Sequence, residues 1–411
     1  MGLAELFPRI LGEDVPVEFR AHDGSRAGRI GSDLAMEVRS PLALSHLASS
    51  PGELGLARAY VSGHLEVHGD MYETLAAIPS LALEELPLKL RLELGAKLAA
   101  YRLWWPVSPP EIEERPRGLR HSKARDKSSV SYHYDVSNRF YEWVLGPSMA
   151  YTCAVFPEQS STLEEAQFTK HDLVARKLGL TEGMRLLDVG CGWGGMVVHA
   201  AERYGVRALG VTLSRQQAQW AQKVIAERGL ADLAEVRHLD YRDVPEGEFD
   251  AVSSIGLAEH VGKDKLPSYF RFLHGKLKPG GRMLNHCITR PDGTFGAKAG
   301  KFISRYVFPD GELEGPGDLV SMMNNNGFEI RHEENLREHY ALTLAGWCRN
   351  LEENWDEAVE EVGRARARVW RLYMAASRLG FELNNIQLHQ ILGVKLDGAD
   401  ARMPLRLPWR I

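Results

Sequence analysis

The sequence predicts an α/β protein in which a parallel β-sheet is covered by helices on both faces, joined to a smaller amino-terminal α+β domain. Strand and helix patterns alternate between residues 162 and 286, which is typical of βαβ units. An apolar strand leads into a glycine-rich turn at residues 190–194. The chain has 411 residues, more than one typical domain needs. We therefore expect two domains.

The first region, residues 1–110, is predicted to be the smaller domain, associated with lipid or membrane. Short β-like runs occur at residues 15–20 and 35–38, and apolar residues recur at helical spacing at 42–48 and 90–101. This region contains no catalytic constellation of its own.

Residues 111–129 are predicted to be a basic linker. Several prolines between 106 and 116 argue against a long helix. Six basic residues, opposed only by Asp126, then follow: Arg115, Arg117, Arg120, Lys123, Arg125 and Lys127. The segment is either a solvated linker or a strip that contacts anionic headgroups, with each charge near the surface worth about 1 kcal/mol.

Residues 130–411 are predicted to be the catalytic domain. The patterns predict helices over residues 162–177, 194–204 and 215–227, and a long helical stretch over 342–377. Strands are expected at residues 185–189, 207–211, 234–238, 249–255 and 282–286.

Composition excludes several classes of protein. The formal net charge of −5 and the lack of a recognised module give nucleic-acid binding little support. No run of eighteen apolar residues predicts a membrane span, and the first ten residues do not read as a secretory signal. The four cysteines are sparse and show no metal-ligand spacing, so we expect a cytoplasmic protein without a metal site.

The strongest single motif is the strand and turn from Leu186 to Gly194. Glycines allow a sharp turn and close approach of a ligand at the carboxyl edge of a sheet. A dinucleotide site would also carry an acid at the tip of the next strand, but residues 210–214 read Gly-Val-Thr-Leu-Ser. Asp188, just before the first glycine, favours S-adenosylmethionine (SAM) instead.

Six motifs in order then resemble the cyclopropane-fatty-acid and mycolic-acid cyclopropane synthase family. They are residues 133–138 (His-Tyr-Asp-Val-Ser-Asn), 151–154, the Asp188 turn, 210–214, 259–262 (Glu-His-Val-Gly) and 384–387. The resemblance implies a Rossmann-like class I SAM methyltransferase fold. Residues 57–63 also resemble, more loosely, the amino-terminal domain of the bacterial phospholipid enzymes.

The resemblance implies two sets of site residues. The SAM contacts fall on Tyr151, Thr152, Asp188, Gly190, Gly192, Gly194, Thr212, Leu213, Gln217, Tyr241 and Arg242, with Gln217 standing in for the missing ribose acid. A bicarbonate ion is held beside the reacting carbons by Cys153, Glu259, His286, the backbone of Ile288, and Tyr340, with the aromatic side chains of Tyr134 and Tyr373 near the alkene.

The chemistry of an alkene agrees with this set. An alkene is a weak nucleophile, so it needs a strong electrophile such as a sulfonium methyl, and its methylation leaves a carbocation. A small anion can remove the proton where burial of a charged side chain would be costly, with Glu259 and His286 fixing its position. Tyrosine rings stabilise a nearby cation by about 0.5–2 kcal/mol each.

The expected reaction is SAM-dependent conversion of a cis double bond in an unsaturated phospholipid to a cyclopropane. Two departures from the family pattern beside the expected anion site, Ala258 and Asn285, leave a methylene-branched product as a rival. A third, Ser377, replaces a cysteine of many phospholipid enzymes and argues against a nucleophile at that position. Methylation of a small molecule at oxygen or nitrogen, and a non-catalytic SAM- and lipid-binding protein, are further alternatives. We expect peripheral attachment to the inner, anionic face of the membrane; a homodimer or larger oligomer is left open.

Overall fold

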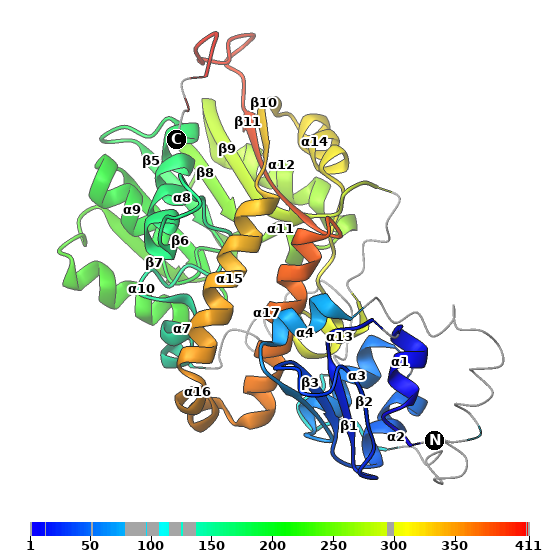
Figure 1. Cartoon of the computed structure of the whole chain (residues 1–411). Coiled ribbons are helices and arrows are strands. Elements are labelled where there is room, and N and C mark those ends of the chain that lie inside the picture. The colour runs from blue at the N-terminus through cyan, green and yellow to red at the C-terminus, as the bar shows by residue number, and fades with distance from the viewer. Residues whose placement is uncertain are drawn as a thin grey trace. The chain divides into compact units, whose positions relative to one another are not determined.

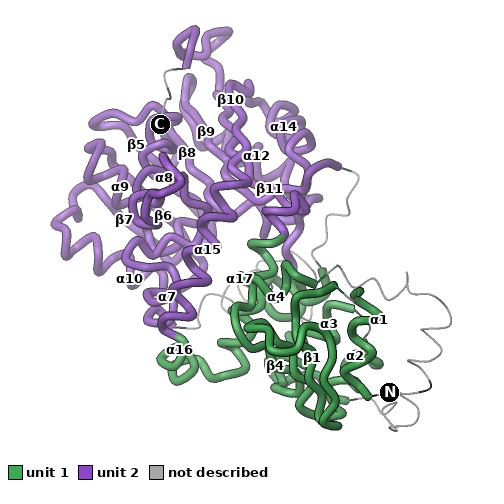
Figure 2. Tube along the Cα trace, in the orientation of Figure 1, with its two compact units in different colours: residues 1–115, 300–309, 355–379 green, residues 116–299, 310–354, 380–411 purple. Residues whose placement is uncertain are grey.

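The computed structural model describes residues 2–12, 14–50, 52–78, 96, 107–114, 125, 137–293, 300–407 and 409. Its contacts divide the chain into two compact units (Figures 1 and 2). Unit 1 consists of residues 1–115, 300–309 and 355–379, and unit 2 of residues 116–299, 310–354 and 380–411. Two segments of the range predicted as the catalytic domain, 300–309 and 355–379, therefore group with the amino-terminal region.

Unit 1 contains a small four-stranded sheet in the order β2-β1-β3-β4. The strands are β1 (Glu18–Ala21), β2 (Arg26–Gly28), β3 (Ala35–Val38) and β4 (Leu65–His68). The helices are α1 (Leu6–Leu11), α2 (Leu42–Ser49), α3 (Glu53–Val61), α4 (Met71–Ala77), α13 (Lys301–Tyr306), α16 (Trp355–Val362) and most of α17 (Arg364–Glu382). The α+β class predicted for this region is confirmed. The predicted helical pattern at 90–101 and most of the basic linker lie outside the described residues.

Unit 2 is built on a seven-stranded sheet in the order β10-β11-β9-β8-β5-β6-β7. Its strands are β5 (Arg185–Val189), β6 (Arg207–Thr212), β7 (Ala234–His238), β8 (Phe249–Ile255), β9 (Leu277–Thr289), β10 (Glu329–Asn335) and β11 (Gln387–Val394). The five strands from β7 to β9 are parallel, and β11 runs antiparallel between β9 and β10. The predicted α/β class is confirmed.

Helices cover both faces of this sheet (Figure 1). The helices of unit 2 are α7 (Asn138–Leu145), α8 (Leu163–Leu178), α9 (Gly195–Tyr204), α10 (Arg215–Glu227), α11 (Ala258–Val261), α12 (Leu266–Lys276), α14 (Pro316–Asn325) and α15 (Arg337–Glu353), with short 3₁₀ turns η2 (Tyr241–Asp243) and η3 (Lys263–Lys265). Of these, α7 packs against α15. The stretch predicted as one helix at 342–377 is instead divided among α15, α16 and α17. Gly363, with a φ of 80°, lies at the second break, where a left-handed residue interrupts the helical backbone.

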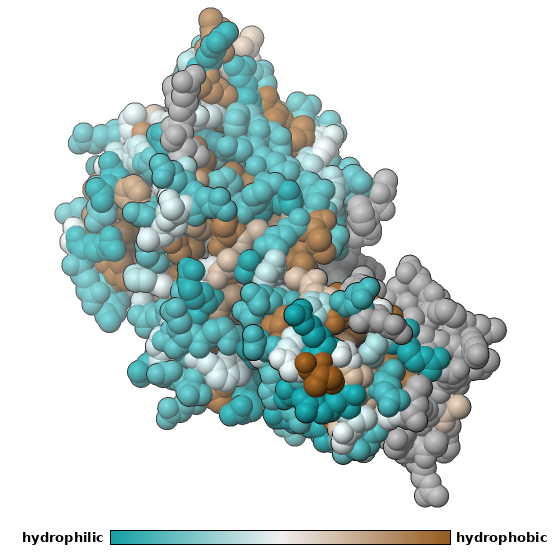
Figure 3. Space-filling model, viewed as in Figure 1, coloured by the Kyte–Doolittle hydropathy of each residue, from teal (hydrophilic) through white to brown (hydrophobic). Residues whose placement is uncertain are grey.

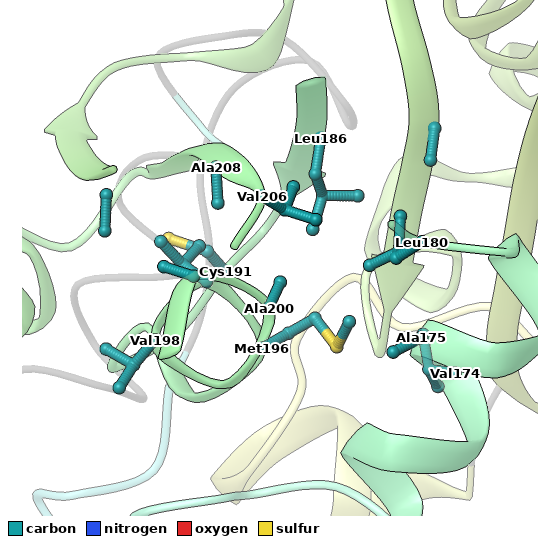
Figure 4. Packing of buried hydrophobic residues seen from close by; sticks show 14 of the residues in the cluster. Val174, Ala175, Leu180, Leu186, Cys191, Met196, Val198, Ala200, Val206 and Ala208 are labelled. Atoms are coloured by element: carbon teal, nitrogen blue, oxygen red, sulfur yellow. The ribbon is translucent and has the colours of Figure 1, made fainter. Parts of the chain in front are cut away.

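The helix α8 begins at a capping box, in which Thr162 and Glu165 satisfy each other's backbone N–H groups, and ends at the left-handed Gly179. Its apolar side chains pack against the sheet together with those of α9 (Figure 4). The core on this face includes Val174, Ala175, Leu186, Met196 and Leu284. The opposite face is covered by α11, α12 and α14, so the buried apolar residues of the sheet belong to one of two distinct cores.

The surface shown in Figure 3 is mostly hydrophilic, with apolar residues scattered among polar ones. Among the described residues, the large hydrophobic side chains that are exposed are Ile30, Leu42, Phe168, Leu383 and Leu405. None of the described helices is long and apolar enough to cross a membrane.

Candidate active site

The parallel strands of unit 2 end at one edge of the sheet, and Asp188 lies at that edge on β5. Its side chain is buried, and the Ser253 hydroxyl on β8 donates a hydrogen bond to Oδ1 at 2.6 Å. Burial raises the pKa of Asp188 to about 7, while the bond from Ser253 and the nearby Lys170 act in the opposite direction. The carboxyl group is therefore close to its titration point near neutral pH.

The turn after Asp188 has the backbone conformation that its glycines predict. Gly190, Gly192 and Gly194 have φ angles of 71°, 53° and 83°, all in the left-handed region. A Cβ at Gly194 would lie 2.9 Å from the Cβ of Ala221, so that position has no room for a side chain. A Cβ at Gly192 would meet no described atom within 4 Å. This open side of the turn fits the close approach of SAM that the sequence predicts.

The second strand brings Thr212 and Gln217 together. The Thr212 hydroxyl donates to the Gln217 side-chain oxygen at 2.7 Å, and both residues are buried. The Gln217 backbone N–H in turn donates to the Ser214 hydroxyl, which caps α10. Leu213 lies between them in the chain. The side chain predicted to replace the ribose acid is thus fixed at the carboxyl end of β6.

Tyr241 and Arg242 lie on η2, after β7. The Arg242 guanidinium pairs with Asp240, with Nη2 and Oδ2 2.6 Å apart, and lies over the Tyr241 ring. Tyr241 also packs edge-on against Tyr269. The predicted adenine-side pair therefore lies at the same edge of the sheet, and its contact with SAM stays a prediction.

Two buried side chains of α8 hold Tyr151 and Thr152 in place. The Gln167 amide donates to the backbone oxygens of Ala150 and Thr152 at 3.2 and 2.9 Å. The Lys170 ammonium donates to the Thr152 hydroxyl at 2.8 Å. The sequence interpretation missed Gln167 and Lys170. The signal was their spacing, because Gln167, Lys170 and the apolar Val174 stand at i, i+3 and i+7 and so share one face of α8.

Glu259 and Ile288 make the first contact within the predicted bicarbonate site. Glu259 lies on α11, just beyond the end of β8, and its Oε1 accepts the Ile288 backbone N–H at 2.7 Å. The Glu259 carboxylate thus accepts the β9 backbone N–H that a longer β8 strand would have paired with. Its other oxygen, Oε2, is buried and has no hydrogen-bond partner among the described residues. Burial raises the pKa of Glu259 to about 7.

His286 lies two residues before Ile288 on the same face of β9 and is fully buried. Its Nδ1 is 3.2 Å from the Gln390 side-chain nitrogen on β11, and its Nε2 has no partner among the described residues. Burial, together with the charges of Lys170 and Lys177, holds the pKa of His286 well below its usual value. The imidazole is therefore neutral.

Cys153 and Tyr340 meet at the start of α15. The Cys153 thiol lies 3.8 Å from the Leu336 backbone oxygen, which also accepts the Tyr340 backbone N–H at 3.2 Å. Burial strongly raises the pKa of Cys153, so it stays a thiol that can donate but not a thiolate. Tyr340 is buried against Phe381 and Trp347.

Lys170 lies between the two groups of residues. Burial lowers its pKa to about 8, and Cys153 and Asp188 act in the opposite direction. Its charge also acts on His286. One buried ammonium thus contacts Thr152 and lies in electrostatic range of the cofactor turn, Cys153 and His286.

The remaining predicted residues are less directly placed. Tyr134 lies outside the described residues, and Tyr373 belongs to unit 1, where it packs against Phe308 and Trp370. Their roles beside the alkene stay predictions. Asn285 alternates with His286 along β9, and its amide contacts the Cys287 thiol on the opposite face of the sheet. The Asn285 departure therefore does not face the same side as His286.

Comparison with known proteins identifies the family. Residues 121–391 match the model of the mycolic acid cyclopropane synthetase family. A protein of Mycobacterium tuberculosis described as a probable fatty acid methyltransferase is 54% identical over 405 residues, covering 96% of this chain and 94% of its own length.

Two solved structures are similar to this chain. The cyclopropane synthase MmaA2 from Mycobacterium tuberculosis is 32% identical with a TM-score of 0.62, covering 65% of this chain and 98% of its own. The mycolic acid cyclopropane synthase CmaA1, solved with S-adenosylhomocysteine (SAH), has the same identity and TM-score and covers 65% and 97%. The chain described here therefore belongs to the mycolic acid cyclopropane synthetase family of SAM-dependent methyltransferases.

Proposed function

We propose that this enzyme methylates the double bond of an unsaturated acyl chain in a phospholipid. Bound SAM supplies an electrophilic methyl carbon, and a bound bicarbonate supplies a base. In the net reaction the alkene carbon gains a bond to that methyl carbon, the methyl–sulfur bond breaks to leave SAH, and one proton is lost. The relatives named for fatty acid methylation and for cyclopropane synthesis support a lipid substrate.

The observation that carries this proposal is a pair of buried polar atoms without partners. Glu259 Oε2 and His286 Nε2 are inside the protein, and neither has a hydrogen-bond partner among the described residues. An unsatisfied buried polar atom costs about 1–3 kcal/mol, so such atoms call for a ligand. Both residues lie beside Ile288 at the end of β9. A small oxyanion has the acceptors and the hydroxyl group that would satisfy the pair.

Each residue of the site then has a defined task. Neutral His286 and the Cys153 thiol can donate hydrogen bonds to an anion without a charge of their own. Glu259, whose pKa is about 7, can accept a bond when ionised or donate one when protonated. The Tyr340 backbone N–H and the Cys153 thiol share the Leu336 backbone oxygen at the start of α15. Together they would hold an anion in an interior where an ionised side-chain base would be costly.

The fate of the cation decides the product. Direct loss of a proton from the added methyl closes a cyclopropane ring. If a hydride first shifts from the methyl-bearing carbon to the neighbouring cationic carbon, loss of a methyl proton leaves an exocyclic methylene, a precursor of mid-chain methyl-branched fatty acids. Two observations favour the second product as a rival. The 54% identical relative is described as a fatty acid methyltransferase, and Ala258, small and buried, precedes Glu259.

The test is to incubate the purified protein with SAM and vesicles of monounsaturated phosphatidylglycerol, and to analyse the fatty acids by mass spectrometry. Both products gain one CH₂ group, but only the methylene product is cleaved by ozone at the new branch. Saturated vesicles serve as the negative control, and phosphatidylcholine vesicles test the proposed attraction to an anionic membrane face. A protein that binds SAH but modifies no unsaturated lipid would support the non-catalytic alternative.

A further inference from the structure

A chain of buried hydrogen bonds lies behind His286, on the side away from its unpartnered nitrogen. Gln390 on β11 stands directly opposite His286 in the antiparallel register with β9. Its side-chain nitrogen lies 3.2 Å from His286 Nδ1, and its side-chain oxygen lies 2.7 Å from the Lys177 ammonium on α8. Lys177 also forms an ion pair with Glu334 on β10.

Because these side chains are buried, each of their polar atoms needs a partner within the protein. Lys177 and Gln390 are each 1% exposed and His286 is 0% exposed, so water does not offer alternative partners. Glu334 is partly exposed. Burial lowers the pKa of Lys177, and the charge of Glu334 opposes that change and favours the ammonium form. A buried lysine paired with a carboxylate remains a donor.

The chemistry of the three groups fixes the direction of every bond. An ammonium only donates, so the Gln390 atom that faces Lys177 must be the oxygen. The NH₂ group of Gln390 must then face His286 and donate to Nδ1. Nδ1 can accept only when it carries no proton, so the neutral imidazole carries its proton on Nε2.

We propose that Lys177 and Gln390 are positioning residues that hold His286 in its Nε2–H tautomer. This inference rests on the proposed function, because it assigns the Nε2–H as the donor to the bound anion. With the other tautomer, a lone pair on Nε2 would face the anion and repel it. The ring geometry directs Nε2 away from Gln390, which leaves it available to a ligand.

Charged and titratable groups reach His286 from several elements. Lys170, Lys177 and His171, all on α8, interact electrostatically with His286. Glu259 on α11 bonds to Ile288, two residues further along β9, and Glu334 on β10 pairs with Lys177. Cationic lysines disfavour an imidazolium, and the donor bond from Gln390 adds to that preference. The tautomer is therefore set by neutral hydrogen bonding and not by an ion pair with His286.

The direct test is nuclear magnetic resonance of the 411-residue chain with ¹⁵N-labelled histidine rings. The chain contains 15 histidines, so the His286 signals are assigned by their absence from the His286→Gln variant. The expected result is a protonated Nε2 and an unprotonated Nδ1 near neutral pH, with and without added bicarbonate. A proton on Nδ1, or on both nitrogens, would overturn the proposal.

The Gln390→Glu variant tests the cause of the tautomer. A carboxylate can still accept from Lys177 but can no longer donate to Nδ1, so the proton is expected to move to Nδ1 or to occupy both nitrogens. Turnover should fall about 10–100-fold, as for changes that act through a neighbouring ligand, with the affinity for SAH retained. Lys177→Met frees the amide to rotate and should give a mixture of tautomers.

Gln387→Glu is the matched control, because Gln387 is on the same strand and its amide donates to Asn384 at the surface. It should leave both the tautomer and the turnover unchanged. If the Gln390→Glu variant binds SAH normally and His286 keeps the same tautomer, the proposal that Gln390 sets the tautomer is refuted. The spectrum needs no turnover, so a wild-type protein inactive on every unsaturated lipid would count against the proposed function and not against the tautomer.

Discussion

Replacement of Glu259 by glutamine should separate the chemistry of the site from its effect on stability. The amide oxygen can keep the 2.7 Å bond from the Ile288 N–H, so the local fold should survive. What is lost is the proton that Glu259 gains and releases near neutral pH. Contributions of this kind are worth about 10²–10⁴-fold in rate. We expect turnover to fall by that factor while the affinity for SAH stays nearly unchanged.

The stability change follows from the pKa of the buried carboxyl, which burial raises from 4.5 to about 7. Each tenfold change in proton affinity is worth about 1.4 kcal/mol, so the ionised carboxylate costs the folded state about 3 kcal/mol. The stability contributed by the protonated group is complete below about pH 4.5. It falls as the pH rises and is lost above about pH 7. Glutamine does not titrate, so Glu259→Gln should be more stable than wild type at pH 8.5.

The assay is calorimetric unfolding of both proteins at pH 5 and pH 8.5 in buffer freed of bicarbonate. Other groups titrate in both proteins, so only the difference between them is interpreted. The variant should unfold about 3–6 °C higher than wild type at pH 8.5, and at nearly the same temperature at pH 5. Glu227→Gln, at an exposed position of α10, is the control and should show no such dependence. Equal differences at both pH values, or retained turnover, would refute the reasoning.

Two further predictions concern the cofactor side of the site. Lys170→Met removes the hydrogen bond from the ammonium to the Thr152 hydroxyl, which is worth about 1.5–3 kcal/mol, so SAH should bind about 10–150-fold more weakly in titration calorimetry. The control Lys223→Met, on an exposed helix face, should leave the affinity unchanged. Unchanged SAH binding in Lys170→Met would show that Lys170 does not belong to the site. Gly192→Ala places a side chain in a left-handed turn and on its open side, so SAH affinity should fall at least tenfold, beyond the backbone cost of about 1–2 kcal/mol. Gly183→Ala carries the same backbone cost with equally open space, and a similar loss of SAH affinity there would contradict the assignment.

The sequence predicted the central strands well because they follow regular patterns. The predicted strands at 185–189, 234–238 and 249–255 coincide with β5, β7 and β8. The edge strand β10 was missed because its residues, Glu-Ile-Arg-His-Glu-Glu-Asn, are mostly polar and half-buried and show no apolar alternation. β11 was missed for the opposite reason, since it is buried on both faces and does not alternate either.

The groups behind the site escaped prediction because polar residues on a helix are usually taken as solvent-facing. Gln167, Lys170 and Lys177 all occur in a helix rich in charged residues, yet all three are buried. Only the position of α8 over the sheet reveals that these side chains point inward. The resemblance to the family predicted the candidate ligands, whereas only the folded structure shows the residues that surround them.

The place of β11 in the sheet has a consequence for synthesis of the chain. Among the described strands, β10 pairs only with β11, and β11 supplies the neighbour of β9 on that side. A ribosome therefore completes β9 long before its partner emerges, and the nascent chain carries an open strand edge during that interval. Such edges promote aggregation, so chaperone cover during translation should matter for yield. His286 acquires its neighbour Gln390 on β11 only after the intervening residues 287–389 have been synthesised.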